Sequence, residues 1–299
     1  MTATSVAPPV AMIGLGIMGS AMSRNMIAAG LTVHGYDPVP AAREAFAAMG
    51  GQLAASAAEA AARAEIILTC LPSAAALHAV VADLASMPKG DRVLAETSTL
   101  TLDDKEKARA DLERLGIVML DCPLSGSGSQ AKTRDVLVYG SGPVDAWERC
   151  LPVMRGFSRG PHHLGAFGNG SKMKYVANLL VAIHTVAAGE AFALARKCGL
   201  DPAQMFQVVA DGAGGSRALQ VRGDMLIADR YEPVETMPLD LWRKDLKVIG
   251  DFATAEGCPT PLFAAASQLF ASAIASGWGR LDTAAVALVS ERMAGLGDT

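Results

Sequence analysis

The chain has 299 residues, of which 51% are hydrophobic and 19% charged, and its formal net charge is −4 at pH 7. High hydrophobicity with low charge excludes a disordered regulator. The sequence pI of about 5.8 and the absence of a basic run argue against a nucleic-acid partner. The length predicts two domains of roughly 150 residues each.

The cysteines and histidines predict neither a disulfide framework nor a metal site. The five cysteines are widely spaced and include no CxxC pair, and the five histidines lack the spacing that places two ligands on one helix face. We therefore expect free thiols, no bound metal and a reducing, cytoplasmic location. Residues 1–9 lack the basic start and apolar middle of a signal peptide, so we expect a short disordered tail there.

Strands and helices alternate in the first half of the sequence. The apolar runs predict strands at 10–13, 31–36, 66–70 and 92–97, helices at 18–29, 41–49, 74–85 and 103–115, and extended segments at 117–121 and 136–140. Strands separated by helices of this length are typical of βαβ units. Residues 10–167 are therefore expected to form an α/β domain with a mostly parallel sheet.

Only helical segments are predicted after a cluster of glycines at positions 165, 168 and 170. These segments span 172–198, 202–211, 244–256, 262–276 and 283–293. We therefore place the domain boundary near 165–170 and expect an all-helical domain over 168–299.

The segment 176–195 is apolar and long enough to cross a lipid bilayer. It contains Asn178, His184 and Glu190, however, and these polar groups would be costly in lipid. We interpret it as a helix buried between protein layers or subunits and expect no membrane partner. This helix and the segment 262–275 are apolar around more of their circumference than a monomer's surface helices, which predicts a homo-oligomer.

A glycine-rich loop follows the first predicted strand and opens a helix. It consists of Gly14, Leu15, Gly16, Ile17, Met18 and Gly19. In such a loop the first glycine makes a tight turn, the second lets a pyrophosphate approach the backbone, and the third lets the helix pack on the strand. The free N–H groups of the helix N-terminus bind phosphates. The loop therefore predicts a dinucleotide site.

The second predicted strand ends at Asp37, which lies 18 residues after Gly19. A carboxylate at this position accepts hydrogen bonds from a ribose 2′-hydroxyl and repels a 2′-phosphate. The sequence therefore favours NAD over NADP, although Arg43 keeps NADP open.

Two further groups of polar residues are candidates for substrate chemistry. Residues 125–128 (SGSG) follow a strand and offer N–H groups and hydroxyls to an anion, or form a flexible turn. Lys174 and Asn178 are four residues apart and share a helix face. The lysine there is a candidate general acid/base, or a surface lysine. Lys244-Asp245, taken alone, is an ordinary exposed pair.

Together these separated motifs resemble the β-hydroxyacid dehydrogenase family, which includes 3-hydroxyisobutyrate, tartronate semialdehyde and L-threonate dehydrogenases. The resemblance runs from about residue 10 to beyond residue 247. Residues 14–19 are similar to the family's cofactor loop, and Gly168-x-Gly170-x-x-x-Lys174-x-x-x-Asn178 is similar to its catalytic signature. Other matches are Leu71-Pro72 (adenosine-side loop), Ser98-Thr99 (nicotinamide-ribose side), residues 121–126 (DCPLSG, substrate signature) and Lys244-Asp245 (cofactor side).

The resemblance implies a Rossmann-like N-terminal domain joined by a long helix to an all-α C-terminal domain, and usually a dimer or tetramer. It also implies hydride transfer between NAD and the hydroxyl carbon of a small β-hydroxy acid, with Lys174 as general acid/base. Thr99 and Lys244 would then lie near the cofactor. The expected substrate contacts come from Ser125, Gly126, Ser127, Asn178 and Asp240, although Asp240 is equally compatible with a salt-bridged surface.

Ser127, Arg134 and Met237 depart from the family pattern, and all three lie in segments expected to contact substrate. They leave the identity of the substrate open. The alternatives are an NADPH-dependent reductase of a small aldehyde acid, a 6-phosphogluconate or imine-reductase type of enzyme, and a dinucleotide-binding sensor without catalysis.

Overall fold

The computed structural model describes residues 8–234 and 236–296. The chain divides into two compact units, residues 1–174 and 175–299. The disordered tail predicted for residues 1–9 falls largely outside the described residues.

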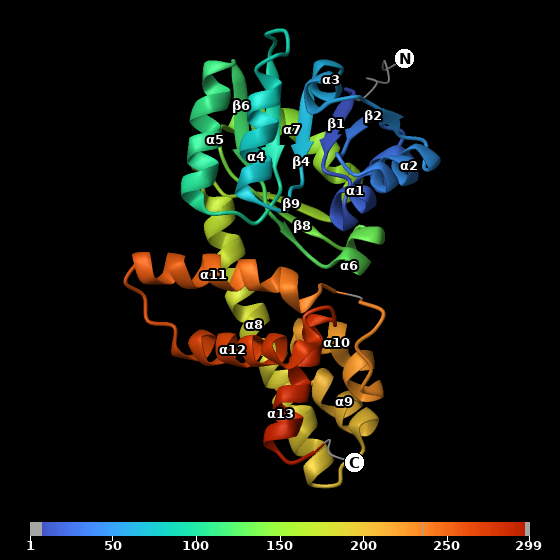
Figure 1. Ribbon diagram of the computed structural model, residues 1–299, viewed down its shortest axis with the longest axis vertical. Helices are drawn as coiled ribbons and strands as arrows, with labels where there is room; N and C mark the ends of the chain where they lie inside the picture. The colour runs from blue at the N-terminus through green and yellow to red at the C-terminus, as the bar shows by residue number, and fades with distance from the viewer. Residues whose placement is uncertain (1–7, 235, 297–299) are drawn as a thin grey trace. The chain divides into compact units, whose positions relative to one another are not determined.

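The first unit is built on a six-stranded parallel sheet with the order β3-β2-β1-β4-β5-β6 (Figure 1). Its strands are β1 (Val10–Ile13), β2 (Val33–Tyr36), β3 (Gln52–Leu53), β4 (Ile66–Thr69), β5 (Arg92–Glu96) and β6 (Ile117–Asp121). The helices between them are α1 (Ile17–Ala28), α2 (Pro40–Ala48), α3 (Ala57–Ala62), α4 (Ala74–Leu84) and α5 (Leu102–Arg114). This strand order is that of a Rossmann fold, as predicted.

Both faces of this sheet are covered, which explains why its strands are continuous apolar runs. Successive residues of β1 point to opposite faces: Val10 and Met12 belong to one hydrophobic core, and Ala11 and Ile13 to the other. Residues of α1 and α2 pack in the first core, and residues of α3, α4 and α5 in the second.

A second, three-stranded sheet in this unit was mostly missed by the sequence prediction. It contains β7 (Leu124–Ser125), β8 (Leu137–Gly140) and β9 (Gly160–His163), with α6 (Gly128–Lys132) and α7 (Val144–Phe157) between them. Only the extended segment 136–140 was predicted. The prediction missed α7 because Pro152 lies inside it, and a proline usually marks the end of a helix.

The second unit is helical. The long helix α8 (Asn169–Lys197) leads into it, followed by α9 (Pro202–Ala210), α10 (Arg217–Ala228), α11 (Leu239–Ala255), α12 (Pro261–Ala273) and α13 (Ala287–Met293), with a π turn and a 3₁₀ turn at Ile274–Trp278 and Thr283–Val286 (Figure 1). The predicted fold class is thus confirmed. Two details were wrong: α10 was missed, and α11 begins at Leu239 rather than 244 because Pro238 occupies its N-cap.

By length and composition α8 resembles a membrane span, and 44% of its most apolar window is buried inside the structure. One side of the helix packs closely in its unit, because a Cβ on Gly189 would lie 2.8 Å from the Cα of Ala287 on α13. On the other side Val176, Leu180 and Leu194 are exposed. The helix therefore has a buried face and an apolar exposed face.

Candidate functional site

The loop between β1 and α1 has the shape that its glycines predict. Gly14 has a φ of +93°, and a Cβ there would lie 2.2 Å from the carbonyl oxygen of Cys70. A Cβ on Gly19 would lie 1.9 Å from the carbonyl oxygen of Gly14. A Cβ on Gly16 would meet no atom of the described chain within 4 Å. Packing therefore requires the first and third glycines, whereas the second leaves open space beside the backbone, where Rossmann folds bind a pyrophosphate.

The acidic residue that follows β2 is bonded to this loop. Asp37 Oδ2 accepts a hydrogen bond from the Leu15 N–H at 2.8 Å, and Asp37 Oδ1 accepts one from the Val39 N–H at 2.8 Å. The residue is only 8% exposed. The carboxylate thus holds the glycine loop against the end of β2, a role that the sequence did not indicate. Each of its oxygens has a second lone pair for a ribose hydroxyl.

The loops that follow β4 and β5 are joined by hydrogen bonds at the same edge of the sheet. The Leu71 N–H donates to Ser98 Oγ at 2.7 Å, and the Ser98 N–H donates to Glu96 Oε1 at 2.9 Å. Pro72 is exposed and Thr99 is half-buried. Because the strand order reverses between β1 and β4, this edge is where open α/β sheets bind ligands.

The predicted substrate loop follows β6, and its first residue, Ser125, belongs to the short strand β7 of the second sheet. Ser127 caps α6: its Oγ accepts from the Gln130 N–H at 3.3 Å, and its own N–H donates to Gln130 Oε1 at 3.0 Å. The Ser127 N–H, expected to bind a substrate carboxylate, is therefore already engaged. Position 126 requires glycine for two reasons. Its φ is +144°, and a Cβ added there would lie 2.7 Å from Val136 Cγ1.

The helical unit brings together three residues of the predicted motifs. The Asn178 side chain is buried and its Nδ2 donates to Asp245 Oδ2 at 3.1 Å, and Asp245 Oδ1 lies 3.2 Å from Lys244 Nζ. Asp245 is only 3% exposed, so Lys244-Asp245 is not the ordinary exposed pair that the residues alone suggest. Lys174 is half-buried and precedes Asn178 by four residues of α8, so the two side chains share a helix face.

Asp240 forms a surface ion pair. The sequence had allowed either a substrate contact or a salt-bridged surface at this position. It lies in the first turn of α11, and its Oδ1 is 3.4 Å from Arg243 Nη2, with both side chains more than half exposed. Its carboxylate also packs against Gly279, where a Cβ would lie 2.4 Å from Asp240 Oδ2. Trp242, on the same helix, is buried against Phe270.

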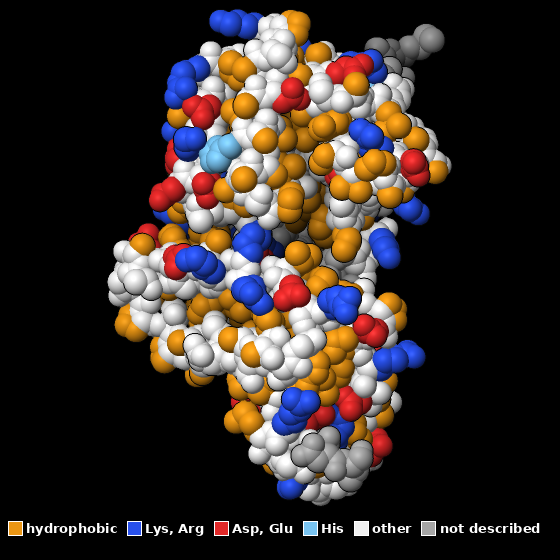
Figure 2. All heavy atoms as spheres, in the orientation of Figure 1, with side chains coloured by type: hydrophobic (Ala, Val, Ile, Leu, Met, Phe, Trp, Pro, Cys, Tyr) orange, Lys and Arg blue, Asp and Glu red, His pale blue; other side chains and the backbone are white. Residues whose placement is uncertain are grey.

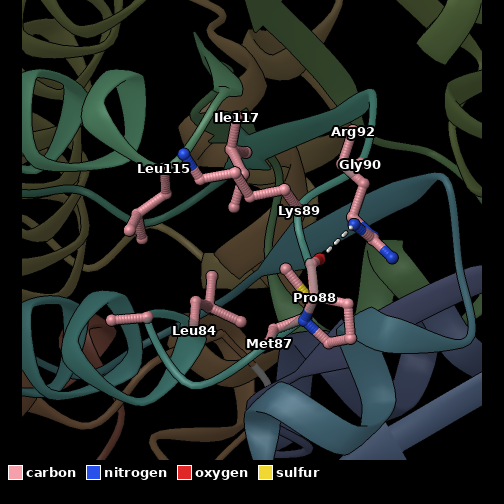
Figure 3. Close-up of a pocket in the computed structure, with 9 residues that line it drawn as sticks. Leu84, Met87, Pro88, Lys89, Gly90, Arg92, Leu115 and Ile117 are labelled. Atoms are coloured by element: carbon pink, nitrogen blue, oxygen red, sulfur yellow. Dashed lines mark hydrogen bonds between the residues drawn. The ribbon is translucent and has the colours of Figure 1, made fainter.

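A small cavity of about 100 Å³ lies at the opposite edge of the parallel sheet (Figure 3). Arg92 and Ile117, at the amino ends of β5 and β6, contribute to its wall, and the Arg92 Nη1 donates to the Pro88 carbonyl at 3.0 Å. Because parallel sheets bind ligands at the carboxyl ends of their strands, this cavity is not the cofactor site.

Comparisons with known proteins agree with this geometry. Residues 9–168 match the family described as the NAD binding domain of 6-phosphogluconate dehydrogenase. Residues 168–290 match the family described as NAD-binding of NADP-dependent 3-hydroxyisobutyrate dehydrogenase. The L-threonate dehydrogenase of Cupriavidus necator is 33% identical, over 93% of this chain and 94% of that protein.

Two solved structures extend the similarity to the whole fold. The 3-hydroxyisobutyrate dehydrogenase of Salmonella typhimurium has a TM-score of 0.85 at 32% identity and covers 94% of this chain and 99% of its own. The Mycobacterium tuberculosis 3-hydroxyisobutyrate dehydrogenase, solved with L-serine, has a TM-score of 0.83 at 30% identity and covers 94% and 98%. This chain belongs to the β-hydroxyacid dehydrogenase family. It is an NAD(P)-dependent dehydrogenase acting on CH–OH groups.

One buried cluster of charged residues in this β-hydroxyacid dehydrogenase was missed by the sequence prediction. Lys105, on α5, is fully buried, and its Nζ lies 2.7 Å from both Glu96 Oε2 and Asp121 Oδ1. Burial alone would lower the pKa of Lys105, but the two carboxylates more than offset this effect and raise the pKa above its usual value. Only their sequence positions were a signal: Glu96 lies near the end of the predicted strand 92–97, Asp121 ends the predicted strand 117–121, and Lys105 lies on the predicted helix between them. Nothing in the sequence indicated that the three side chains are buried together.

Proposed function

We propose that this enzyme catalyses the reversible oxidation of a small β-hydroxy acid with NAD, and that Lys174 is the general acid/base. The observation that supports this assignment most directly is the start of α8. Packing excludes a side chain at Gly170, because a Cβ there would lie 2.2 Å from the Tyr139 carbonyl oxygen. The first turn of the helix is therefore fixed on the first unit, and Lys174 is one turn further along it.

The dinucleotide supplies a hydride acceptor when it is bound. The glycine loop 14–19 would hold its pyrophosphate, Leu71 and Pro72 its adenosine side, and Thr99 and Lys244 its nicotinamide side. The open space at Gly16 fits such a group. The buried Asp37 carboxylate would repel a 2′-phosphate, which supports NAD rather than NADP as the preferred cofactor.

The substrate carboxylate would be held by the Ser125 hydroxyl and the Gly126 N–H, with the Ser127 hydroxyl as a third donor. Fixing the carboxylate orients the alcohol carbon toward the cofactor, and such orientation contributes a large part of the rate. Asn178 would bind the substrate hydroxyl or the Lys174 amine. It is suited to this role because the bond to Asp245 fixes its amide orientation.

During oxidation Lys174 would accept the hydroxyl proton, and during reduction it would return that proton. This role requires a neutral amine, whereas an exposed lysine has a pKa near 10.4. Desolvation and the positive charge of the oxidised cofactor both favour the neutral form. Asn178 is an uncharged neighbour on the same helix face and adds no opposing negative charge.

The decisive measurement is the formation of NADH from NAD, or of NADPH from NADP, with a panel of hydroxy acids. The panel consists of 3-hydroxyisobutyrate, 3-hydroxypropionate, D-glycerate, L-serine, L- and D-threonate, and 6-phosphogluconate. We expect turnover with NAD and at least one acid, and a loss of at least about 100-fold for Lys174→Ala with NADH binding retained. Turnover by Lys174→Ala would remove the lysine from its assigned role, and turnover with NADP alone would reverse the preference assigned to Asp37.

We also propose that the enzyme is a cytoplasmic homodimer or homotetramer. The exposed side of α8 carries Val176, Leu180 and Leu194, and Leu262 of α12 is 68% exposed. Hydrophobic side chains of this kind are visible on the surface of the helical unit in Figure 2. Subunit contacts that cover these side chains would remove their cost in water. Light scattering at micromolar concentration should give a multiple of 30.9 kDa, and a monomeric mass would contradict the proposal.

A further inference from the structure

A chain of buried ions connects the loop after β5 with the first turn of α8. It begins at the Ser98 N–H, which donates to Glu96 Oε1 at 2.9 Å, and continues through the Lys105 ammonium to Asp121. Asp121 in turn accepts from the Ser171 N–H at 2.7 Å and from the Ser171 hydroxyl at 2.8 Å. All five residues are at most 5% exposed.

The Asp121 carboxylate is saturated with donors. Besides Lys105 and the two Ser171 groups, the Ser141 hydroxyl donates to Asp121 Oδ2 at 3.2 Å. A carboxylate has about four lone-pair positions, and here all are used. Its negative charge also lies at the N-terminus of α8, where the helix dipole is positive. The Gly170 N–H completes the connection by donating to Ser141 Oγ at 2.9 Å.

Stability alone does not explain why this connection is ionic. Buried ion groups can often be replaced by apolar side chains of similar volume at no cost in stability, because desolvation offsets their attraction. Unlike apolar contacts, ion pairs and hydrogen bonds depend on direction. They therefore hold their partners in one defined geometry. The geometry defined here is that of Ser171, and Lys174 follows it by three residues in the same helix.

We propose that Lys105 is a positioning residue for the reaction. It fixes the first turn of α8 relative to the Ser98-Thr99 loop, and through that turn it places Lys174 for proton transfer. The inference rests on the proposed role of Lys174. Without the ammonium, two buried carboxylates would face each other with no cation between them, and the Asp121–Ser171 contact would shift.

Two variants with matched controls test this role. Lys105→Met removes the cation while keeping a side chain of similar length, and Lys107→Met is its control on the exposed side of α5. Ser171→Ala removes one bond to Asp121 and leaves all three ions in place, and the exposed Lys172→Ala is its control in the same turn. Ser171→Ala decides the question if Lys105→Met fails to fold. Each protein is assayed for kcat and KM with an acid that the wild type turns over, and for NADH affinity.

We expect kcat to fall about 100-fold for Lys105→Met and about tenfold for Ser171→Ala, because small displacements of a catalytic group have effects of this size. NADH affinity should stay within about twofold, and both controls should retain wild-type kcat. In a Lys174→Ala background, Ser171→Ala should cause no further loss of the residual rate, because its effect passes through the lysine.

Two results would overturn the inference. One is a folded Ser171→Ala enzyme with wild-type kcat. The other is an equal loss from Ser171→Ala with and without Lys174, which would indicate a general structural role. Failure of the proposed function is a separate result, because Lys174→Ala would then retain turnover.

Discussion

The two units of this dehydrogenase present their functional groups in different ways. In the first unit the cofactor loop is defined by its backbone conformation, because packing requires glycine at positions 14 and 19 and Gly16 faces open space. In the second unit the corresponding feature is a pair of side chains, Asn178 and Asp245, which are 67 residues apart in the chain. A backbone site is contained in a short motif, whereas a side-chain pair depends on how distant helices pack.

The sharpest test of the backbone site compares two glycine substitutions in the same loop. Gly19→Ala should destabilise the fold by about 3 kcal/mol, the upper end of the usual cost of overpacking, because its Cβ would lie 1.9 Å from a carbonyl oxygen. Gly16→Ala should leave the unfolding free energy within about 0.5 kcal/mol of wild type but weaken NADH binding about tenfold or more, because its Cβ occupies the space left for the pyrophosphate. Urea unfolding and NADH fluorescence titration measure the two effects.

If both substitutions destabilised the protein equally, the open space at Gly16 would have no functional meaning. If Gly16→Ala bound NADH as wild type does, the pyrophosphate would have to lie elsewhere. Either result would break the contrast between the packing glycines and the binding glycine.

This contrast also explains which parts of the molecule the sequence predicted. Strands β1 and β6 were predicted with the observed limits, because uninterrupted apolar runs between turn residues are a local signal. The glycine loop was also predicted, because its motif is contained in six consecutive residues. The capping box of Ser127 could also have been predicted, because its Ser-x-x-Gln pattern is local. It was missed because Ser127 was interpreted only as a substrate contact.

The missed features depend on tertiary structure. The burial of Lys105 could not be predicted from its own helix, because the neighbouring Asp103, Asp104, Glu106 and Lys107 give that segment the composition of a solvated surface. Asp245 was misjudged in the same way, since only the packing of α11 buries it against Asn178. Charged residues that pair across the fold carry no periodic signal, so their burial becomes evident only in the three-dimensional structure.

The side-chain pair of the second unit is tested by Asp245→Ala. Loss of the carboxylate leaves the buried Asn178 amide without its acceptor, which should lower the unfolding free energy by about 1–3 kcal/mol. Asp251→Ala on the same helix is the matched control, because its ion pair with Lys247 is exposed and should contribute less than about 0.5 kcal/mol. Urea unfolding of both variants measures the difference. Equal losses would show that the Asn178–Asp245 bond does not hold the helices in place.

The smallest expected effect is a difference in how the two units respond to acid. In the first unit, burial, with a further contribution from the Arg63 charge, lowers the pKa of His34 below its ordinary value of 6.5. The unfolded chain therefore takes up the proton first, and the stability contributed by His34 is lost as the pH falls below 6.5 through the lower pKa of the folded state.

In the second unit Glu291 has the opposite effect on how stability depends on pH. Burial and the nearby Asp229 raise the pKa of Glu291 above its ordinary value of 4.5, although Arg196 opposes them. Its contribution to stability is therefore full below 4.5 and is lost as the pH rises through the raised pKa. Urea unfolding measures both effects as the pH falls from 7 to 5. The unfolding free energy of the wild type should decrease relative to that of His34→Gln and increase relative to that of Glu291→Gln. Parallel changes against both variants would mean that burial does not set the two groups in opposite directions.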